Sequence, residues 1–450
     1  MIENIPADNR GEANVGAMID HGPWGFYQKC IVGLLAAAYL VDGIANQSLG
    51  LAIPALVKVW GVPREAFATI AAIGLVGLTI GAAVGGVLGD RIGRKPMLVG
   101  SVLLFGVMTM AAGTAESLSA LFWLRFLDGL GMGAMIPNGA AMISETTPLR
   151  KRPMAIAISM VFIAVGSMMS GLIASVVLPQ WGWQAHFYVL GSFGVVAGVT
   201  FLFILPESPL FLARVRGNSE QLAATMRRLG HVLRADQPLA HQRPTGGDRF
   251  SGIGVLFAEG VKKSTLALWF AFFFCLLASY SVFSWVPAML SDLGYPLSLA
   301  SLGMTANGAG SIIGGILSGW FIERFGSRRS ILWCAAFSII SALALGGMIY
   351  AGVTSLVLIF SGLAVMGFFL ANVHNGMYTL SAYMYPPHVR STGVGAAAAV
   401  ARVGAIASSF VGVAALSMGG GTSYFLVIAM AIVLCFIGTA IVSRHVPPVK

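Results

Sequence analysis

Twelve apolar runs, each long enough to approach or cross a lipid bilayer, constrain this chain more than any other feature. Six lie in the first half, near 28–50, 66–89, 97–113, 117–143, 154–178 and 184–205. Six lie in the second half, near 265–290, 298–322, 330–350, 354–380, 391–416 and 422–443. A spanning helix needs about 20 mostly apolar residues, and lipid leaves backbone groups no partner except each other. The pattern predicts an all-α membrane protein with twelve transmembrane helices.

Composition agrees with a membrane protein and argues against other classes. Hydrophobic residues make up 57% and charged residues 10%, whereas soluble proteins carry about a quarter charged residues. The net charge of +10 is spread over short loops, without the basic, aromatic-studded face that nucleic-acid binding needs. The sequence contains neither a phosphate-binding Gly-Lys loop nor a metal-ligand pattern of histidines or cysteines. We therefore expect no enzyme activity, no catalytic residues, no metal and no cofactor beyond a coupling proton.

The apolar runs divide the chain into segments and orient it. We expect a tail at 1–27, a six-helix bundle at 28–205, a central loop at 206–264 with one amphipathic helix, a second bundle at 265–443, and a tail at 444–450. Residues 1–27 lack the order of charged, apolar and cleavage regions that a cleaved signal peptide has.

The basic residues orient the chain in the membrane. With the N-terminus in the cytoplasm, every lysine and arginine except Lys58, Arg64, Arg125 and Arg402 is cytoplasmic, as the positive-inside rule requires. Both termini should be cytoplasmic in a multi-pass inner-membrane protein.

The two halves repeat each other. Glycines at intervals of four, ending at Gly89, precede an acidic and basic cluster in the first half, and Gly310 and Gly314 precede a similar cluster in the second. Glycines at this interval line one face of a helix and allow close packing. Two related six-helix bundles are typical of a transporter whose substrate site lies between them, near the middle of the membrane.

The motifs resemble those of the major facilitator superfamily. Three segments carry the resemblance: 86–95, which ends in Gly93-Arg94-Lys95; Arg125-x-x-x-Gly129; and Pro206-Glu207-Ser208-Pro209. Within the superfamily, the chain is most similar to the aromatic acid:proton symporters of the 4-hydroxybenzoate, protocatechuate and benzoate type. That similarity rests on Asp42-Gly43 with 52–56, on 135–138 with Ser144-Glu145, on 284–287, and on 390–395 with 401–404. One departure is Ala45, where the family usually has a second acid.

The resemblance implies a function and leaves alternatives. It implies a symporter that imports a small aromatic carboxylate, such as a hydroxybenzoate or another lignin-derived acid, together with protons. Because of Ala45, a non-aromatic organic acid or a sugar-like metabolite is also a possible substrate, and an efflux antiporter is a further alternative. A transporter-like sensor is disfavoured because such proteins usually carry a large soluble extension. We expect a monomer in the lipid bilayer.

Asp42, Arg125 and Asp128 are the candidates for proton coupling. At about 1.5 Å per residue, Asp42 and Arg125 come to similar depths in the first and fourth spans, which are neighbours in the superfamily fold. Burial disfavours a charged carboxylate and a nearby arginine favours it, so this site could switch protonation. A permanent ion pair between the two spans is the alternative. Asp128, three residues after Arg125, could instead pair with it locally.

Polar and aromatic side chains inside other spans are candidates for binding substrate. Arg402 and Arg125 offer planar forks that suit a carboxylate. The remaining candidates are Asn46, His374, Asn375, Tyr280 and Trp285. For each there is a structural alternative: Arg402 could bind backbone carbonyls, His374 could be a packing residue, and the aromatic residues could face lipid.

Charged residues at the cytoplasmic ends of the spans are expected to form a gate. We predict that their ion pairs hold the outward-open state, although they could serve only as topology signals. The first half contributes Asp90, Arg91, Arg94, Lys95, Glu145 and Arg152, and the second half contributes Glu323, Arg324, Arg328 and Arg390.

Overall fold

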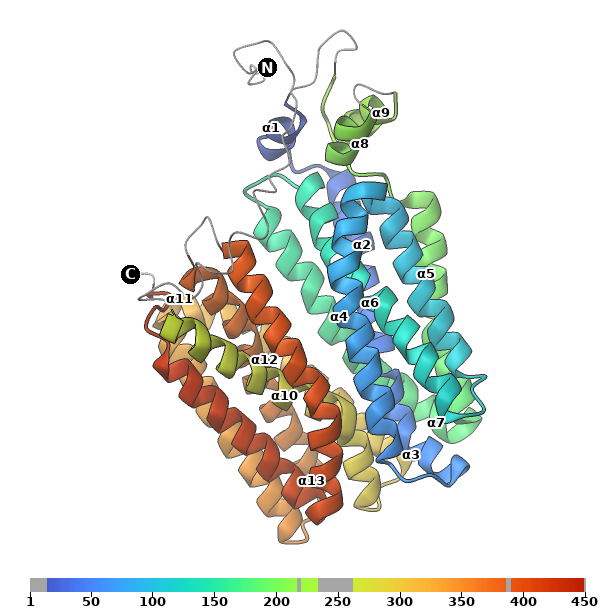
Figure 1. The fold of residues 1–450 in the computed structure, drawn as a ribbon, viewed down its shortest axis with the longest axis vertical. Helices are drawn as coiled ribbons and strands as arrows, with labels where there is room; N and C mark the ends of the chain where they lie inside the picture. Colours follow the sequence, from blue (N-terminus) through green and yellow to red (C-terminus); the bar gives the residue numbers. More distant parts are fainter. Residues whose placement is uncertain (1–13, 217–219, 234–261, 386–389, 449–450) are drawn as a thin grey trace.

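The computed structural model describes residues 14–216, 220–233, 262–385 and 390–448, which form helices and connecting segments (Figure 1). The first half contains α1 (Val15–Asp20), α2 (Phe26–Asn46), α3 (Ser48–Trp60), α4 (Ala66–Ile92), α5 (Arg94–Ala112), α6 (Leu118–Thr146) and α7 (Arg152–Ile204). The short helices α8 (Pro209–Arg216) and α9 (Glu220–Arg228) follow. The second half contains α10 (Lys262–Asp292), α11 (Leu297–Tyr350), α12 (Leu356–Met384) and α13 (Arg390–Ile441).

The apolar helices account for twelve membrane crossings. Nine helical segments of the described chain are long and apolar enough to span a bilayer. Three of them, α7, α11 and α13, exceed 50 residues, or more than about 75 Å at 1.5 Å per residue, against a hydrocarbon core of about 30 Å. Each of the three is broken by glycine, at Gly182, at Gly326, and at Gly419 and Gly420. Each therefore crosses twice, and the prediction of twelve spans is confirmed.

The first span is longer than the sequence suggested and is interrupted. It was expected at 28–50, whereas α2 and α3 together run from Phe26 to Trp60. The interruption lies at Gln47, between the last residue of α2 and Ser48, the first of α3. Pro54, which has no amide hydrogen to donate, lies inside α3. Three polar residues, Asn46, Gln47 and Ser48, lie at the break, but apolar residues flank them on both sides, so the mean hydropathy of a window of about 20 residues does not register it.

The glycine rows predicted from the repeat lie at equivalent helix contacts. Added Cβ atoms at Gly77 and Gly81 would lie 2.3 and 2.2 Å from backbone oxygens of α6. At Gly310 and Gly314 they would lie 1.8 and 2.2 Å from backbone oxygens of α12. Small residues let helices in lipid approach this closely. Thus α4 packs on α6, and the first part of α11 packs on α12, as the repeat requires.

The two bundles lie side by side, with α1, α8 and α9 together at one end (Figure 1). We call this the α1 end and the opposite end, where α3 finishes, the α3 end. Buried side chains of α1 and α9, such as Ile19 and Met226, pack on the first bundle. At the α3 end the bundles touch: Arg64 pairs with Asp292 of α10, and Glu65 accepts a hydrogen bond from the hydroxyl of Ser417 in α13.

Candidate functional site

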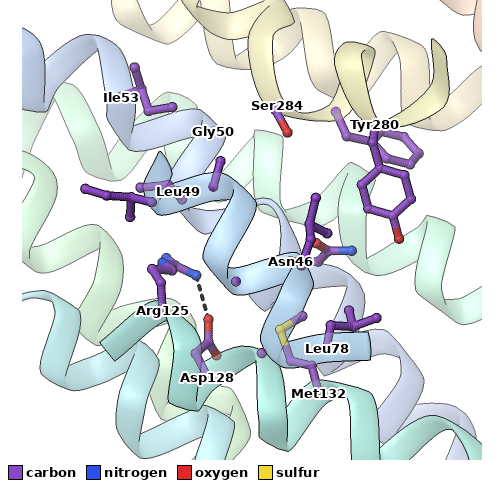
Figure 2. A pocket seen from close by; sticks show the side chains of 16 residues that line it. Asn46, Leu49, Gly50, Ile53, Leu78, Arg125, Asp128, Met132, Tyr280 and Ser284 are labelled. Carbon is purple, nitrogen blue, oxygen red and sulfur yellow. Dashed lines mark hydrogen bonds and ion pairs between the residues drawn. The ribbon is translucent and has the colours of Figure 1, made fainter. Parts of the chain in front are cut away.

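A cavity lies between the two bundles, in the half of the lining spans nearer the α3 end, and Figure 2 shows the side chains that line it. Its empty space, including the opening to solvent, is about 610 Å³. The first bundle contributes α2, α3, α4 and α6, and the second contributes α10. The polar lining residues are Asn46, Arg125, Asp128, Tyr280 and Ser284, and the apolar ones include Leu49, Ile53, Leu78, Met132 and Phe283.

Arg125 and Asp128 form a buried ion pair on one wall of this cavity. The Nη1 of Arg125 lies 2.6 Å from the Oδ2 of Asp128, one turn further along α6. Thr109 donates a hydrogen bond of 3.0 Å to the other carboxylate oxygen. The guanidinium also lies 5.2 Å from the ring centre of Phe187. These contacts offset part of the cost of burying the two charges, and the Nε of Arg125 has no hydrogen-bond partner among the described residues. The predicted local pairing of Asp128 with Arg125 is confirmed.

We expected Asp42 to bind Arg125. In the structure Asp42 lies near Arg125 but does not bind it. Its side chain is buried, and its Oδ1 has no hydrogen-bond partner within the described part of the chain. It is close enough to Asp128 and Tyr39 for electrostatic interaction. Arg125 binds Asp128 instead, because a residue three positions along the same helix is in reach without any approach of α2 to α6. Asp42 is thus a second buried carboxyl group beside the Arg125–Asp128 pair.

Two of the predicted substrate residues, Asn46 and Tyr280, meet across the bundle interface. Asn46 and Tyr280 face each other (Figure 2), and the phenol of Tyr280 interacts with the Asn46 side chain. Arg402, half-buried in α13, is close enough to influence Tyr280 and Tyr378 electrostatically. The ring of His374 stacks on Tyr378 at 5.6 Å between ring centres. The sequence therefore named two residues that line the cavity from opposite bundles, and it missed Tyr378.

Neither Trp285 nor Asn375 lines the cavity, and the same is true of Arg402 and His374. Trp285 is fully buried in α10, and its ring packs against the backbone of α13 at Gly412. Asn375 contacts Ser318 at 3.4 Å across the α11–α12 interface. The periodicity of a helix explains this difference, since Ser284 and Trp285 are adjacent in sequence but point about 100° apart.

Two buried polar residues beside Arg125 were not anticipated. Ser48 accepts a hydrogen bond of 2.7 Å from the Nη2 of Arg125. His186, in the second part of α7, lies with its Nε2 3.2 Å from the carbonyl oxygen of Ser48. Since a carbonyl oxygen can only accept, the Nε2 of His186 carries the proton. A single histidine inside an otherwise apolar run was the signal that could have found His186.

The predicted gate residues of the first half form a network within their own bundle at the α1 end. The Nη2 of Arg94 lies 2.5 Å from Asp90 and 3.0 Å from Glu145. Glu207 accepts hydrogen bonds of 2.9 and 3.1 Å from the backbone amides of Arg94 and Lys95. Glu207 belongs to the mid-chain motif, so two separate sequence signatures meet here. Arg91 is exposed on the same end.

The other predicted gate residues have different surroundings. Arg152 pairs with Asp20 of α1 at 2.5 Å, which ties the first helix to the first bundle. In the second bundle, Glu323 and Arg324 are exposed, and Arg328 points an Nη2 toward the carbonyl oxygen of Ala440 at 3.4 Å. The side chain of Arg390 lies outside the described residues. A role of these clusters as a gate remains a prediction.

Comparison with known proteins decides the family. The model of the Major Facilitator Superfamily matches residues 35–258 and 268–450. The chain belongs to this superfamily. It is accordingly a multi-pass membrane transporter and not an enzyme, and the expected resemblance is confirmed.

Similar proteins carry aromatic acids. The chain is 31% identical to a gallate transporter of Pseudomonas putida, over 90% of this chain and 89% of the relative. It is 29% identical to the 4-hydroxybenzoate transporter PcaK of Acinetobacter baylyi, over 95% of this chain and 93% of the relative. Among solved structures, the xylose transporter XylE from E. coli matches with a TM-score of 0.72 and 17% identity, over 94% of this chain and 99% of that one.

Proposed function

We propose that this protein is a proton-coupled symporter that imports a small aromatic carboxylate across the inner membrane. The observation that carries the proposal is the cavity between the bundles, because it brings a buried ion pair, a neighbouring carboxylate and aromatic side chains to one place. A cavity at the interface of two bundles is where alternating access exposes a substrate to each side in turn.

The lining suits an aromatic ring that carries a carboxylate. Tyr280 and Phe283 lie edge to face, 5.8 Å between ring centres, and present apolar surface to the cavity together with Met132. Aromatic rings favour such offset and edge contacts with another ring. Arg125 and Arg402 supply the guanidinium groups for the carboxylate. The gallate and 4-hydroxybenzoate transporters among its relatives support this substrate class for the present chain.

Charge balance supports coupling to a proton. Four charged residues lie in the middle of the spans, namely Asp42, Asp128, Arg125 and Arg402. Two negative and two positive charges balance, so a bound monovalent carboxylate leaves one uncompensated negative charge in lipid. Such a charge is costly away from water. One proton taken up by Asp42 or Asp128 would restore neutrality, and the loaded carrier could then reorient. The stoichiometry proposed is one proton per monovalent anion.

The distribution of basic residues gives the proposed direction and topology. The α1 end carries most of the lysine and arginine residues and is proposed to face the cytoplasm, with both termini. The contacts of Arg64 and Glu65 with the second bundle would then close the outer side in the state described. We propose that a monomer suffices, since one chain supplies both bundles and the whole cavity lining.

A transport assay tests the proposal directly. Protein reconstituted in liposomes is given labelled benzoate, 4-hydroxybenzoate, gallate, succinate and xylose, with an acidic outside and an alkaline lumen. We expect uphill accumulation of one or more aromatic acids that an uncoupler abolishes. Uptake of succinate or xylose alone would reject the substrate class. Accumulation of the same size with and without the uncoupler would reject proton coupling. Accumulation that requires an acidic lumen would indicate efflux.

A further inference from the structure

Ser48 occupies an unusual position among the buried polar groups. It is the first residue of α3, directly after the break at Gln47, and it is fully buried. Its hydroxyl donates a hydrogen bond of 2.5 Å to the carbonyl oxygen of Ala45 in the last turn of α2. The same hydroxyl accepts from Arg125 of α6, and its own carbonyl accepts from His186 of α7. One residue thus joins both sides of the break to two other helices.

Arg125 divides its guanidinium between Ser48 and the charge pair. Nη1 binds Asp128 and Nη2 binds Ser48, while Nε has no hydrogen-bond partner among the described residues. A hydrogen bond to a charged group is stronger than a neutral one. If Asp128 gains a proton, the attraction at Nη1 weakens. The guanidinium is then free to shift, and its contact with Ser48 transmits that shift to the first span.

The residues flanking Ser48 contact the second bundle. Asn46, two positions before, interacts with Tyr280. Gly50, two positions after, lies so close to α10 that an added Cβ would be 3.0 Å from the carbonyl oxygens of Phe283 and Ser284. Two contacts between the bundles therefore lie on either side of the residue that Arg125 holds. At the break, Gln47 keeps right-handed helical dihedral angles (φ −86°, ψ −10°), and its carbonyl accepts a hydrogen bond of 3.1 Å from Leu51, so one irregular turn joins α2 to α3.

We propose that Ser48 is a positioning residue that transmits the charge state of the Arg125–Asp128 pair to the bundle interface through the break in the first span. This inference rests on the proposed function. Ser48 itself does not titrate. The titratable and charged groups around it are Asp42 and Tyr39 on α2, Asp128 on α6, His186 on α7, Tyr280 on α10 and Arg402 on α13.

The experiment measures the pH response of the bundles without any substrate. Nitroxide labels are placed through Val59→Cys and Met418→Cys, two exposed positions at the α3 end of the first and second bundle, with Cys30→Ser to remove the exposed native thiol. We expect the distance distribution of the otherwise unchanged protein to shift between about pH 8 and pH 5. Ser48→Ala should lose this shift, and Ser48→Thr, which keeps the hydroxyl, should retain it.

Ser159→Ala is the matched control, because Ser159 is also a buried serine whose hydroxyl is bonded to its own helix and not to Arg125. A distance shift of normal size in Ser48→Ala would overturn the inference. So would a label-to-label distance in the parent protein that does not change with pH.

In liposomes, Ser48→Ala should keep exchange of substrate at equal pH within about threefold, while proton-driven accumulation falls about tenfold, as expected for one charge-assisted hydrogen bond. Equal loss of both activities would contradict it. Failure of the parent to accumulate substrate would reject the proposed function instead.

Discussion

Arg125 holds three neighbours at once: the Asp128 carboxylate, the Ser48 hydroxyl and the ring face of Phe187. Asp42 lies close to this group without a direct bond to Arg125. The carboxyl groups of Asp128 and Asp42 therefore differ in how firmly they are held. Asp128 is held by two side chains, which keeps its position fixed. The Oδ1 of Asp42 has no hydrogen-bond partner among the described residues, and we infer that Asp42 is the carboxyl group that exchanges a proton.

Replacing Asp42 tests this division. Asp42→Asn should abolish proton-driven accumulation, because an amide cannot take up and release the proton that balances the substrate. Exchange of substrate at equal pH should persist within about threefold, since reorientation of the loaded, neutral carrier needs no titration step. Both are measured with labelled substrate in liposomes. If the variant still concentrates substrate uphill under a pH gradient, Asp42 is not the coupling group.

Arg402 offers a test of carboxylate recognition in the second bundle. Arg402→Lys keeps the charge but loses the planar fork, so we expect KM for an aromatic carboxylate to rise about tenfold. A neutral competitor, such as the corresponding amide, should inhibit the variant and the parent equally. Initial uptake rates over a range of concentrations give both values. An unchanged KM would remove Arg402 from the binding site.

At the scale of helices, the sequence predicted much of what the structure contains. The twelve spans followed from hydropathy, and the glycine rows of α4 and α11 correctly indicated close helix contacts. The rotation of a helix about its own axis is set by packing, which hydropathy does not encode. Depth alone predicted a contact between Asp42 and Arg125. The i,i+3 spacing did indicate the pairing of Arg125 with Asp128, but nothing in the sequence indicated its contact with Ser48. For the same reason, Trp285 was expected in the cavity and instead packs on Gly412.

The glycine row of α4 allows a matched pair of substitutions. Gly81→Ala places a Cβ 2.2 Å from the backbone oxygen of Leu130 in α6, so the helices must separate. We expect a loss of about 1–3 kcal/mol in stability, as for overpacked cores. Gly86→Ala, on the same helix, meets nothing within 4 Å and should be neutral. Thermal unfolding of the purified proteins in one detergent compares them. Equal melting temperatures would show that α4 and α6 do not rely on this contact.

At the scale of the whole molecule, transport requires the two bundles to part at the α3 end. Arg64 of the first bundle pairs with Asp292 of the second, and both side chains are partly exposed, at 28% and 43%. Pairs exposed to this degree contribute about 0–1 kcal/mol. Such a weak contact can close the outer side and still break in every cycle. A strongly bonded closure would trap the carrier in one state.

Asp292→Asn should therefore shift the balance of states modestly toward the one that is open at the α3 end. From the strength of exposed pairs, we expect a change of at most about fivefold in the ratio of the two populations. The labels at Val59→Cys and Met418→Cys report the ratio directly. Glu116→Gln, which neutralises another exposed acid of the first bundle at this end, is the control. A larger effect in the control than in Asp292→Asn would show that net charge, and not the pair, controls the opening.

The titration of Glu65 determines whether the contact between the bundles at the α3 end depends on pH. A hydrogen bond from Ser417 is the main cause that holds the pKa of Glu65 below its ordinary value of 4.5, with help from its own backbone amide and Arg64. When the bundles part, the bond is lost and the pKa returns toward 4.5. The contact therefore contributes fully above pH 4.5 and is lost as pH falls through the lower pKa of the closed state.

The closure should accordingly be insensitive to pH over the range in which transport is driven. We expect Glu65→Gln to change the rate of uptake but not the shape of its pH profile between about pH 5.5 and 8, because Glu65 stays ionised throughout that range in both states. Initial rates at several external pH values, with the lumen held constant, measure the profile. Ser417→Ala should give the same shape. A midpoint that moves in Glu65→Gln would assign the pH response to the outer contact, whereas an unmoved midpoint leaves it with the carboxylates of the cavity.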